Sequence, residues 1–201
     1  ERPTHWNTSW DYARFEVCAH KWVDVSEGNY GVALLNDCKY GHDVKDSVLR
    51  LTLIKSPVEP DETADRGRHV FTYALLPHAG DWREGRVVQE AYELNYPLLF
   101  TAKPACPDGD LPAEGGMASL NCSHAVIETV KKAEDDDACV IRVYECMQYR
   151  ADGIRLRLHR PIRKAVLCNL VEGGETPAAI EDGVIVFSLR PFEIKTFKVW
   201  F

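Results

Sequence analysis

The sequence predicts an all-β protein, an antiparallel, supersandwich-like β-sandwich with one short helix near Trp82–Leu94. Short runs in which apolar and polar residues alternate recur along most of the chain, and this period of two is typical of half-buried strands. Clusters of Gly, Asp and Glu separate the runs at a spacing of roughly ten residues, as in sandwiches of short strands. Hydrophobic residues make up 45% of the 201 positions, which is enough for a substantial core.

The first expected strands lie before residue 56. In Arg14–Val25, alternate residues are apolar, although Trp22 and Val25 break the alternation, which indicates a bulge or a curved strand. The stretch Tyr30–Gly41 (YGVALLNDCKYG) begins with an apolar run typical of a buried strand and ends in a polar cluster. Ser47–Lys55 (SVLRLTLIK) places its leucines on one face, which predicts a third strand with a leucine core face.

The only helical period follows a long loop and another strand. Ser56–Gly67 is rich in Pro, Asp and Glu and predicts a loop, and His69–Leu76 predicts a strand. Within Trp82–Leu94, apolar residues recur at spacings of four and three, which predicts an amphipathic helix. Pro97 prevents the helix from continuing much further.

The second half of the chain is expected to consist almost entirely of strands. Residues 103–116 contain three prolines and three glycines and predict a surface loop or a seam between two sheets, with a subdomain boundary there. The pairs Asp152-Gly153 and Asp182-Gly183 are the strongest hairpin signals. The expected strands are Met117–Leu120, Ala125–Lys131, Cys139–Cys146, Ile154–Leu158, Lys164–Leu170, Val184–Leu189 and Ile194–Phe201.

Charge and cysteine content exclude several classes of protein. Lys and Arg total 24 against 31 Asp and Glu, giving a net charge of −7, so nucleic acid is not an expected partner. No apolar run approaches the roughly 20 residues that cross a bilayer, so no membrane association is expected. The seven cysteines are odd in number and form no CxxC pair, which predicts reduced thiols and a cytoplasmic location.

Motifs for metal binding or nucleophilic catalysis are missing from the sequence. The seven histidines stand singly, without HxH, HxxxH or HExxH spacing, and are interpreted as surface or hydrogen-bonded residues. There is no GxSxG elbow and no glycine-rich loop that opens a helix. The residues therefore identify no catalytic side chain and no metal ligand.

A polar cluster at the end of the Tyr30–Gly41 stretch is the candidate functional site. It consists of Asn36, Asp37, Lys39 and Tyr40, which a rigid strand would deliver to a reachable loop. Amide, carboxylate and ammonium groups can bond sugar hydroxyls, and Tyr40 offers a ring face. The alternative, which the residue types favour, is an ordinary turn.

A glycosidase also needs two carboxylates that flank the scissile bond. The aspartates at predicted strand ends are Asp37, Asp43, Asp65 and Asp81, whereas the Asp135–Asp137 run is interpreted as a solvated hairpin tip. The spacing between these carboxylates does not follow from the sequence.

Four stretches of the chain resemble one known family. SWDYARFE, ALLNDCKYG, YALLPH and RPFEIKTF are similar to the C-terminal region of cytosolic or bacterial-type α-mannosidases of glycoside hydrolase family 38, and the similarity runs in one order through nearly the whole chain. The resemblance implies that residues 1–201 are the C-terminal β domain of a larger, retaining α-mannosidase.

In this family, the zinc ligands and the aspartate nucleophile lie in an N-terminal α/β domain whose motifs do not occur here. The resemblance therefore carries over no catalytic or metal residue, and zinc or a similar divalent metal is expected in the missing catalytic domain. It implies two partners, the catalytic domain of the same polypeptide and a mannose-containing oligosaccharide, and leaves a homo-oligomer of the parent enzyme open.

Two alternatives come from other classes of protein. The chain could be a stand-alone carbohydrate-binding β-sandwich, or a structural or dimerisation domain. Weak sugar binding would favour the first alternative, whereas a large apolar patch without sugar binding would favour the tail of a larger enzyme.

Overall fold

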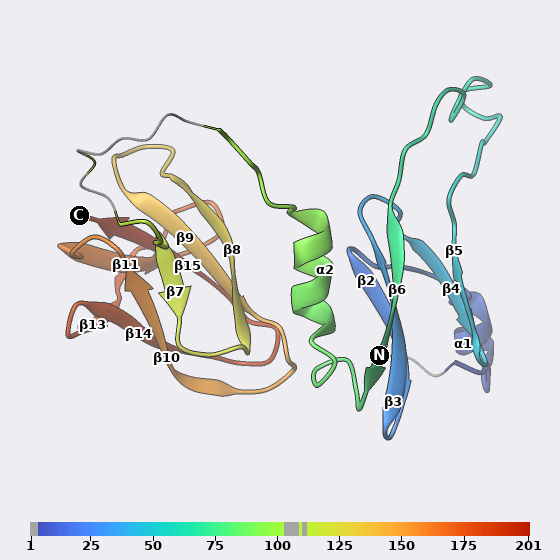
Figure 1. Cartoon of the computed structure of the whole chain (residues 1–201), viewed down its shortest axis with the longest axis horizontal. Helices are drawn as coiled ribbons and strands as arrows, with labels where there is room; N and C mark the ends of the chain where they lie inside the picture. Colours follow the sequence, from blue (N-terminus) through green and yellow to red (C-terminus); the bar gives the residue numbers. More distant parts are fainter. Residues whose placement is uncertain (1–3, 103–108, 110–111) are drawn as a thin grey trace. The chain divides into compact units, whose positions relative to one another are not determined.

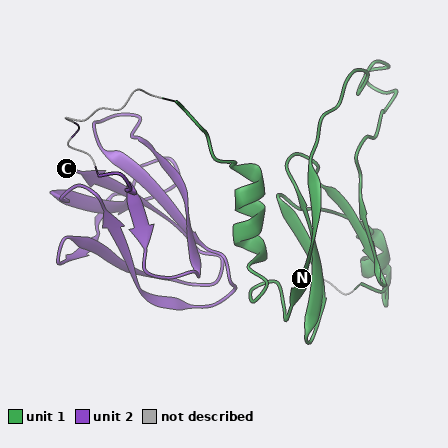
Figure 2. Ribbon diagram, in the orientation of Figure 1, with its two compact units in different colours: residues 1–103 green, residues 104–201 purple. Residues whose placement is uncertain are grey.

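The computed structural model describes residues 4–102, 109 and 112–201, which form two compact units, residues 1–103 and 104–201 (Figure 2). Every strand pair within the described residues is antiparallel, and the predicted all-β class is confirmed. Most of the predicted loop or seam, residues 103–108 and 110–111, lies outside the described residues.

Unit 1 contains two three-stranded sheets and two helices (Figure 1). One sheet has the order β1-β4-β5 and the other β2-β3-β6. The elements are α1 (Ser9–Ala13), β1 (Glu16–Cys18), β2 (Trp22–Glu27), β3 (Tyr30–Asn36), β4 (Gly41–Lys45), β5 (Val48–Leu51), β6 (Tyr73–Ala79) and α2 (Val87–Asn95).

Strand β3 is the centre of its sheet and confirms the predicted buried strand. Ala33 and Leu35 lie on the face that packs against Val87 and Ala91 of α2, and all four side chains are buried. The apolar run of β3 and the apolar stripe of α2 are therefore the two halves of one small core. Trp22, Ala74, Leu76, Trp82 and Leu94 extend this core.

The predicted helix Trp82–Leu94 exists, but it begins at Val87, five residues later than expected. The Asp81 carboxylate accepts hydrogen bonds from the backbone N–H groups of Arg83 and Glu84, which stabilises a separate turn. Arg86 then takes a left-handed conformation with φ of 53°, which an α-helix does not allow.

The sequence did not predict the five-residue helix α1. Thr8 and Asp11 form a capping box, in which the Thr8 hydroxyl accepts from the Asp11 N–H and the Asp11 carboxylate accepts from the Thr8 N–H. The fold thus has two helices in its described residues, where the sequence predicted one.

The strands of unit 1 differ from the prediction at four places. The strand predicted at Ser47–Lys55 covers only Val48–Leu51. Arg14–Val25 is two strands, because Lys21 between them has φ of 68°. The strand predicted at His69–Leu76 runs from Tyr73 to Ala79. Strand β4, which was not predicted, follows the polar cluster directly and pairs with both β1 and β5.

Unit 2 is a sandwich of a four-stranded and a five-stranded sheet (Figure 1). The first has the order β13-β14-β10-β7 and the second β12-β11-β15-β9-β8. Their inward residues form one core, which includes Ile141, Leu156, Ile185 and Phe197. The strands are β7 (Ala118–Leu120), β8 (Ala125–Lys132), β9 (Cys139–Glu145), β10 (Ala151–Leu158), β11 (Lys164–Cys168), β12 (Thr176–Pro177), β13 (Ala179–Glu181), β14 (Val184–Leu189) and β15 (Ile194–Trp200).

The two Asp-Gly pairs have different structures. Asp182-Gly183 is the predicted hairpin turn between β13 and β14, with φ of 49° and 76°. Asp152-Gly153 is not a hairpin, because it lies inside β10 where the register with β14 shifts between Ala151 and Ile154. Gly153, with φ of 66°, forms part of this β-bulge.

A buried carboxylate ties two loops of unit 2 together. Glu145, at the end of β9, has no exposed surface and accepts backbone hydrogen bonds from Met147 (2.6 Å), Gln148 (3.0 Å) and Tyr149 (3.1 Å). It also accepts from the N–H of Phe192 at 2.9 Å. One side chain thus holds the turn after β9 against the turn before β15.

A buried lysine has a similar role in the same unit. The Lys198 ammonium lies 2.7 Å from the Asp136 carboxylate and 2.8 Å from that of Glu175, and its side chain is 6% exposed. These carboxylates raise the pKa of Lys198. The predicted hairpin tip at Asp135–Asp137 is therefore anchored at its middle residue.

Candidate functional site

The four predicted site residues follow one another where β3 leaves its sheet, but their side chains have different surroundings. Asn36 is the last residue of β3 and is completely buried, and Asp37 is partly buried. Lys39 is partly buried, and Tyr40 is 46% exposed. Of the four side chains, only that of Tyr40 is therefore exposed.

Asn36 joins β3 to its neighbours. Its backbone N–H donates to Lys21 O at 2.9 Å, and its carbonyl accepts from Asn95 Nδ2 of α2 at 3.0 Å. Its side-chain Oδ1 accepts from the Lys39 N–H at 2.8 Å and closes the turn. Nδ2 of Asn36 is buried and has no hydrogen-bond partner in the described residues.

Asp37 binds the segment that leads into β6. Its backbone N–H donates to Thr72 O at 3.2 Å, and its Oδ2 accepts from the Thr72 N–H at 3.0 Å. The neighbouring Cys38 thiol and the Thr72 N–H favour the carboxylate form and lower the pKa of Asp37. Asp37 is therefore charged at neutral pH, and its Oδ1 is buried without a partner in the part of the chain that the structure describes.

Lys39 and Tyr40 lie against aromatic rings. The Lys39 ammonium is 5.1 Å from the centre of the Phe71 ring, and the Tyr40 ring is 4.4 Å from that of His20. The Tyr40 carbonyl accepts hydrogen bonds from Ala19 N and from Nδ1 of the buried His42. Burial lowers the pKa of His42.

The supporting residues of the cluster, Thr72, Asn95 and His20, carry no local signal in the sequence. They come from a loop, a helix and the gap between β1 and β2, and only the tertiary fold brings them to the end of β3. The hydrogen bonds of Asn36 and Asp37 agree with a structural turn. A contact of the cluster with substrate remains a prediction.

The other aspartates at strand ends are each bound to a nearby group rather than to one another. Asp43 pairs with Arg50 at 2.7 Å, Asp65 accepts from the Ser56 N–H at 2.9 Å, and Asp81 accepts from the Arg83 N–H at 2.8 Å. Among the described residues, no three His, Cys, Asp or Glu side chains come together in a way that could hold a metal ion.

Unit 1 contains a buried histidine–aspartate pair that the sequence did not predict. His78 Nε2 lies 2.7 Å from Asp24 Oδ1, and Asp24 also accepts from the Ser26 hydroxyl. The His78 ring fits between Gly31 and Gly85, where an added Cβ would lie 2.4 Å from a ring atom in each case. Two scattered glycines are the only sequence sign of this close packing.

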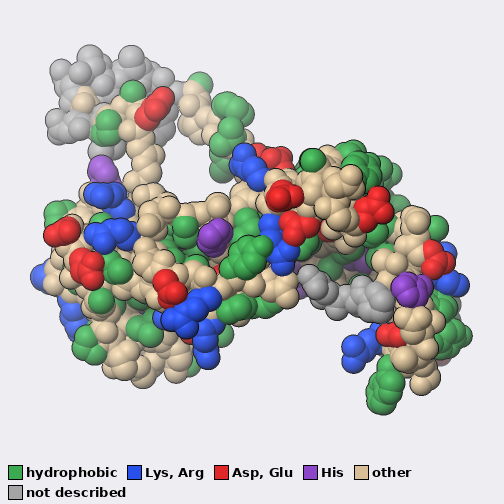
Figure 3. Space-filling model, turned by 90° about the horizontal axis from the view of Figure 1, so that it is seen from below, with side chains coloured by type: hydrophobic (Ala, Val, Ile, Leu, Met, Phe, Trp, Pro, Cys, Tyr) green, Lys and Arg blue, Asp and Glu red, His purple; other side chains and the backbone are tan. Residues whose placement is uncertain are grey.

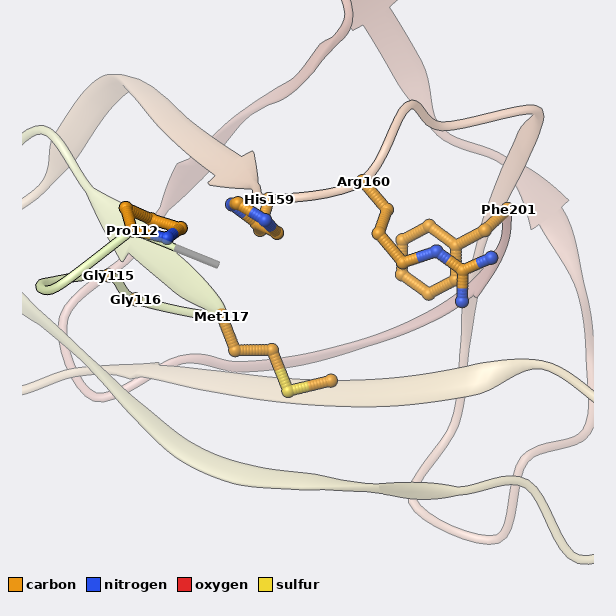
Figure 4. Close-up of a pocket in the computed structure, with 7 residues that line it drawn as sticks. All are labelled: Pro112, Gly115, Gly116, Met117, His159, Arg160 and Phe201. Carbon is orange, nitrogen blue, oxygen red and sulfur yellow. The ribbon is translucent and has the colours of Figure 1, made fainter. Parts of the chain in front are cut away.

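Unit 2 has a surface pocket that contains none of the predicted site residues (Figure 4). It is lined by Met117, His159, Arg160 and Phe201, together with Pro112, Gly115 and Gly116. The Arg160 guanidinium lies against the Phe201 ring, 4.9 Å from its centre. The lining residues thus offer a cation and a ring but no carboxylate.

The surface carries charges of both signs. On the face shown in Figure 3, basic and acidic side chains are interspersed with apolar ones. None of the helices in the described ranges is long and apolar enough to span a membrane.

Two family models match the chain. The glycosyl hydrolases family 38 C-terminal domain matches residues 1–63, and the glycosyl hydrolases family 38 C-terminal beta sandwich domain matches residues 124–197. Both matches agree with the family that the sequence motifs indicated.

Curated relatives match almost the whole chain. Alpha-mannosidase 2C1 of Homo sapiens is 45% identical over 201 residues, which cover 96% of this chain and 19% of the relative. Alpha-mannosidase G of Dictyostelium discoideum is 39% identical over 98% of this chain and 18% of the relative. The chain thus spans about a fifth of the length of these relatives.

A solved structure shares the fold. An alpha-mannosidase from Enterococcus faecalis V583 aligns with a TM-score of 0.74 at 23% identity, over 98% of this chain and 22% of that one.

Proposed function

Because this chain belongs to the C-terminal region of glycosyl hydrolase family 38, we propose that it is the non-catalytic C-terminal part of a retaining, metal-dependent α-mannosidase. The observation that carries the proposal is the match of nearly the whole chain to about a fifth of each α-mannosidase. In this proposal the zinc ligands and the nucleophile belong to the rest of the polypeptide, on which this region packs. The free state of the six described cysteines supports a cytoplasmic enzyme.

The alternatives, a stand-alone sugar-binding module and a dimerisation domain, are not favoured, because the relatives are α-mannosidases that extend far beyond the matched region. The substrate in this proposal is a mannose-containing oligosaccharide. The complete enzyme should hydrolyse an aryl α-mannoside with retention of configuration, and chelation should abolish turnover until zinc or cobalt is restored. A chelator-treated, metal-free enzyme that retains full turnover would contradict metal dependence.

We also propose that the polar cluster at the end of β3 lines the substrate cleft of the complete enzyme. Tyr40 is half exposed, and Lys39 can reach a hydroxyl group without breaking the turn, whose hydrogen bonds come from Asn36 and Asp37. In this arrangement the buried pair sets the position of the loop, and the outer pair contacts sugar. The charge of Asp37 would also contribute to the electrostatic field of the cleft.

The test uses Asp37→Ala in the complete enzyme, with Asp61→Ala as its control. Asp61 makes a similar local contact, accepting from the Thr63 N–H at 2.8 Å, but it lies in the Ser56–Gly67 loop. If the cluster lines the cleft, Asp37→Ala removes a charge from the cleft and releases the loop that carries Lys39 and Tyr40, so it should lower kcat/KM about tenfold or more, or about 1.4 kcal/mol of transition-state binding. Asp61→Ala should leave kcat/KM unchanged.

A purely structural turn would give a different result. Asp37→Ala would then lower the free energy of unfolding by about 0.5 to 2 kcal/mol and leave the specific activity of the folded fraction intact. Unchanged kcat/KM in Asp37→Ala, and also in Tyr40→Phe, would reject the cleft assignment while leaving the α-mannosidase assignment in place.

A further inference from the structure

Strand β6 has one open edge. In the described part of the chain it ends the sheet β2-β3-β6 and pairs with β3 alone (Figure 1). Seven residues of β6, Tyr73–Ala79, therefore have a free side. An open edge presents unpaired N–H and C=O groups that can bind another strand.

The register shows which backbone groups point outward. Asp37 N donates to Thr72 O and Gly80 N donates to Asn29 O, so the even-numbered residues from 72 to 80 direct their backbone groups at β3. The odd-numbered residues from 73 to 79 direct theirs to the open edge. Pro77 is one of these, and since it has no N–H, its position costs no hydrogen bond to β3. Outward N–H donors near the start of β6 are therefore those of Tyr73 and Leu75.

The same two residues carry exposed apolar side chains. Tyr73 is 56% exposed and Leu75 is 68% exposed, on the face opposite to Ala74 and Leu76, which pack towards α2. Sheets normally protect such edges with charged side chains or proline. In β6 (YALLPHA) this protection comes from Pro77, in the second half of the strand, while the ring of His78 is buried against Asp24. The first half, Tyr73–Leu75, has neither a charged residue nor a proline.

The opposite edge of the sheet is protected differently. Strand β2 (WVDVSE) ends in the exposed acidic residue Glu27, whereas its other acidic residue, Asp24, is buried against His78. Apolar exposure and free N–H groups thus coincide at Tyr73–Leu75 and not at the other edge. This coincidence is what a strand-binding site requires, since backbone bonds supply affinity and alternate side chains supply specificity.

We propose that the Tyr73–Leu75 edge of β6 pairs with an extended segment from the rest of the α-mannosidase polypeptide, whose apolar side chains cover Tyr73 and Leu75. We take the partner segment from the same polypeptide, because about four-fifths of the residues of the matched relatives lie outside the region that this chain matches. A covalently connected segment has a high effective concentration at this edge. The inference rests on the proposed function, because it takes the partner to be the same enzyme.

The experiment compares two cysteine variants of the complete enzyme, Leu75→Cys and Val58→Cys. Val58 is a matched control, since it is 69% exposed and lies in the Ser56–Gly67 loop. Each enzyme is alkylated before and after denaturation, and the modified peptide is quantified by mass spectrometry, so that native cysteines do not interfere. In the native enzyme Leu75→Cys should react about tenfold or more slowly than Val58→Cys, because access needs local opening. After denaturation the two rates should be equal.

Equal native rates would overturn the proposal. Protection of Leu75→Cys that disappears when the enzyme is diluted to monomers would also overturn it, since a second copy would then cover the edge. If Leu75→Cys does not fold, hydrogen exchange of the unmodified enzyme gives the answer. The outward N–H groups of Tyr73 and Leu75 should be as protected as those of Ala74 and Leu76, and rapid exchange at the outward pair alone would reject the pairing.

These readouts do not depend on turnover. An enzyme that hydrolyses no mannoside but protects Leu75→Cys would contradict the proposed function and leave the strand pairing intact.

Discussion

Replacing the buried carboxylate of Glu145 should destabilise unit 2 more than any surface substitution. Glu145→Ala removes the acceptor of four backbone N–H groups, which belong to Met147, Gln148, Tyr149 and Phe192. The methyl group of alanine replaces none of these bonds. The turn after β9 and the turn before β15 lose their common anchor.

The magnitude follows from the number and burial of the donors. A hydrogen bond to a charged group contributes about 1.5 to 3 kcal/mol, so four would sum to about 6 kcal/mol or more if all stayed buried. Gln148 and Tyr149 lie near the surface and can recover water when the turn opens, which reduces the loss. We expect Glu145→Ala to lower the free energy of unfolding by about 3 to 5 kcal/mol, a large part of the 5 to 15 kcal/mol of a typical domain.

Urea unfolding of unit 2, followed by circular dichroism, measures this change. Glu145→Gln, which keeps one carbonyl oxygen of the same shape, should lose less than Glu145→Ala. Glu134→Ala is the surface control, since the Glu134 side chain is 76% exposed. The free energy of unfolding of this variant should stay within about 0.5 kcal/mol of that of the unmodified protein. If Glu145→Ala and Glu134→Ala unfold at the same urea concentration, the four hydrogen bonds do not stabilise the fold as described.

Three further predictions concern other buried groups. Gly85→Ala should cost about 1 to 3 kcal/mol in the free energy of unfolding, because its Cβ would lie 2.4 Å from the His78 ring, and urea unfolding with Gly28→Ala as an uncrowded control measures it. The fold lowers the pKa of His42 from its ordinary value near 6.5, so the neutral side chain stabilises the fold fully above that pH, and this stabilisation is lost as the pH falls towards the lower folded pKa. Between pH 7.5 and pH 5.5, the free energy of unfolding should therefore fall less in His42→Gln than in the unmodified protein. An equal fall in both proteins would contradict this prediction. Lys198→Met should lower the free energy of unfolding by about 1 to 2 kcal/mol, because Asp136 and Glu175 both lose the ammonium group that they contact, and an unchanged thermal midpoint would show that the ion pairs contribute nothing.

Sequence patterns predicted the strands of unit 2 well because their residues are sorted by local physics. Ile154 and Leu156 are buried, whereas Arg157 and His159, on the opposite face, are exposed, as the alternation requires. The same local rule failed at Asp152-Gly153, because a β-bulge and a hairpin turn both need a residue with positive φ. Only the partner strand distinguishes the two cases.

The candidate site was harder to predict than the fold. The sequence located the end of β3 and its polar residues, but it could not show that Thr72 and Asn95 would bind them, since those partners lie 35 and 59 residues away from theirs. Helix α1 was missed for a different reason. Its stability comes from side-chain capping by Thr8 and Asp11 rather than from an apolar stripe, and five residues are too few to show a period.

The position of β15 affects the order in which unit 2 can be made. This strand is the last of the unit along the chain, yet it lies in the middle of the five-stranded sheet between β11 and β9. Because synthesis starts at the N-terminal end, β8 and β9 are made first, and the backbone groups of β9 that pair with β15 stay unpaired until β15 has been made. The sheet can close only then, because β11 and β12 have no other connection to β9. Formation of the five-stranded sheet therefore depends on Ile194–Trp200, the last of its strands to be synthesised.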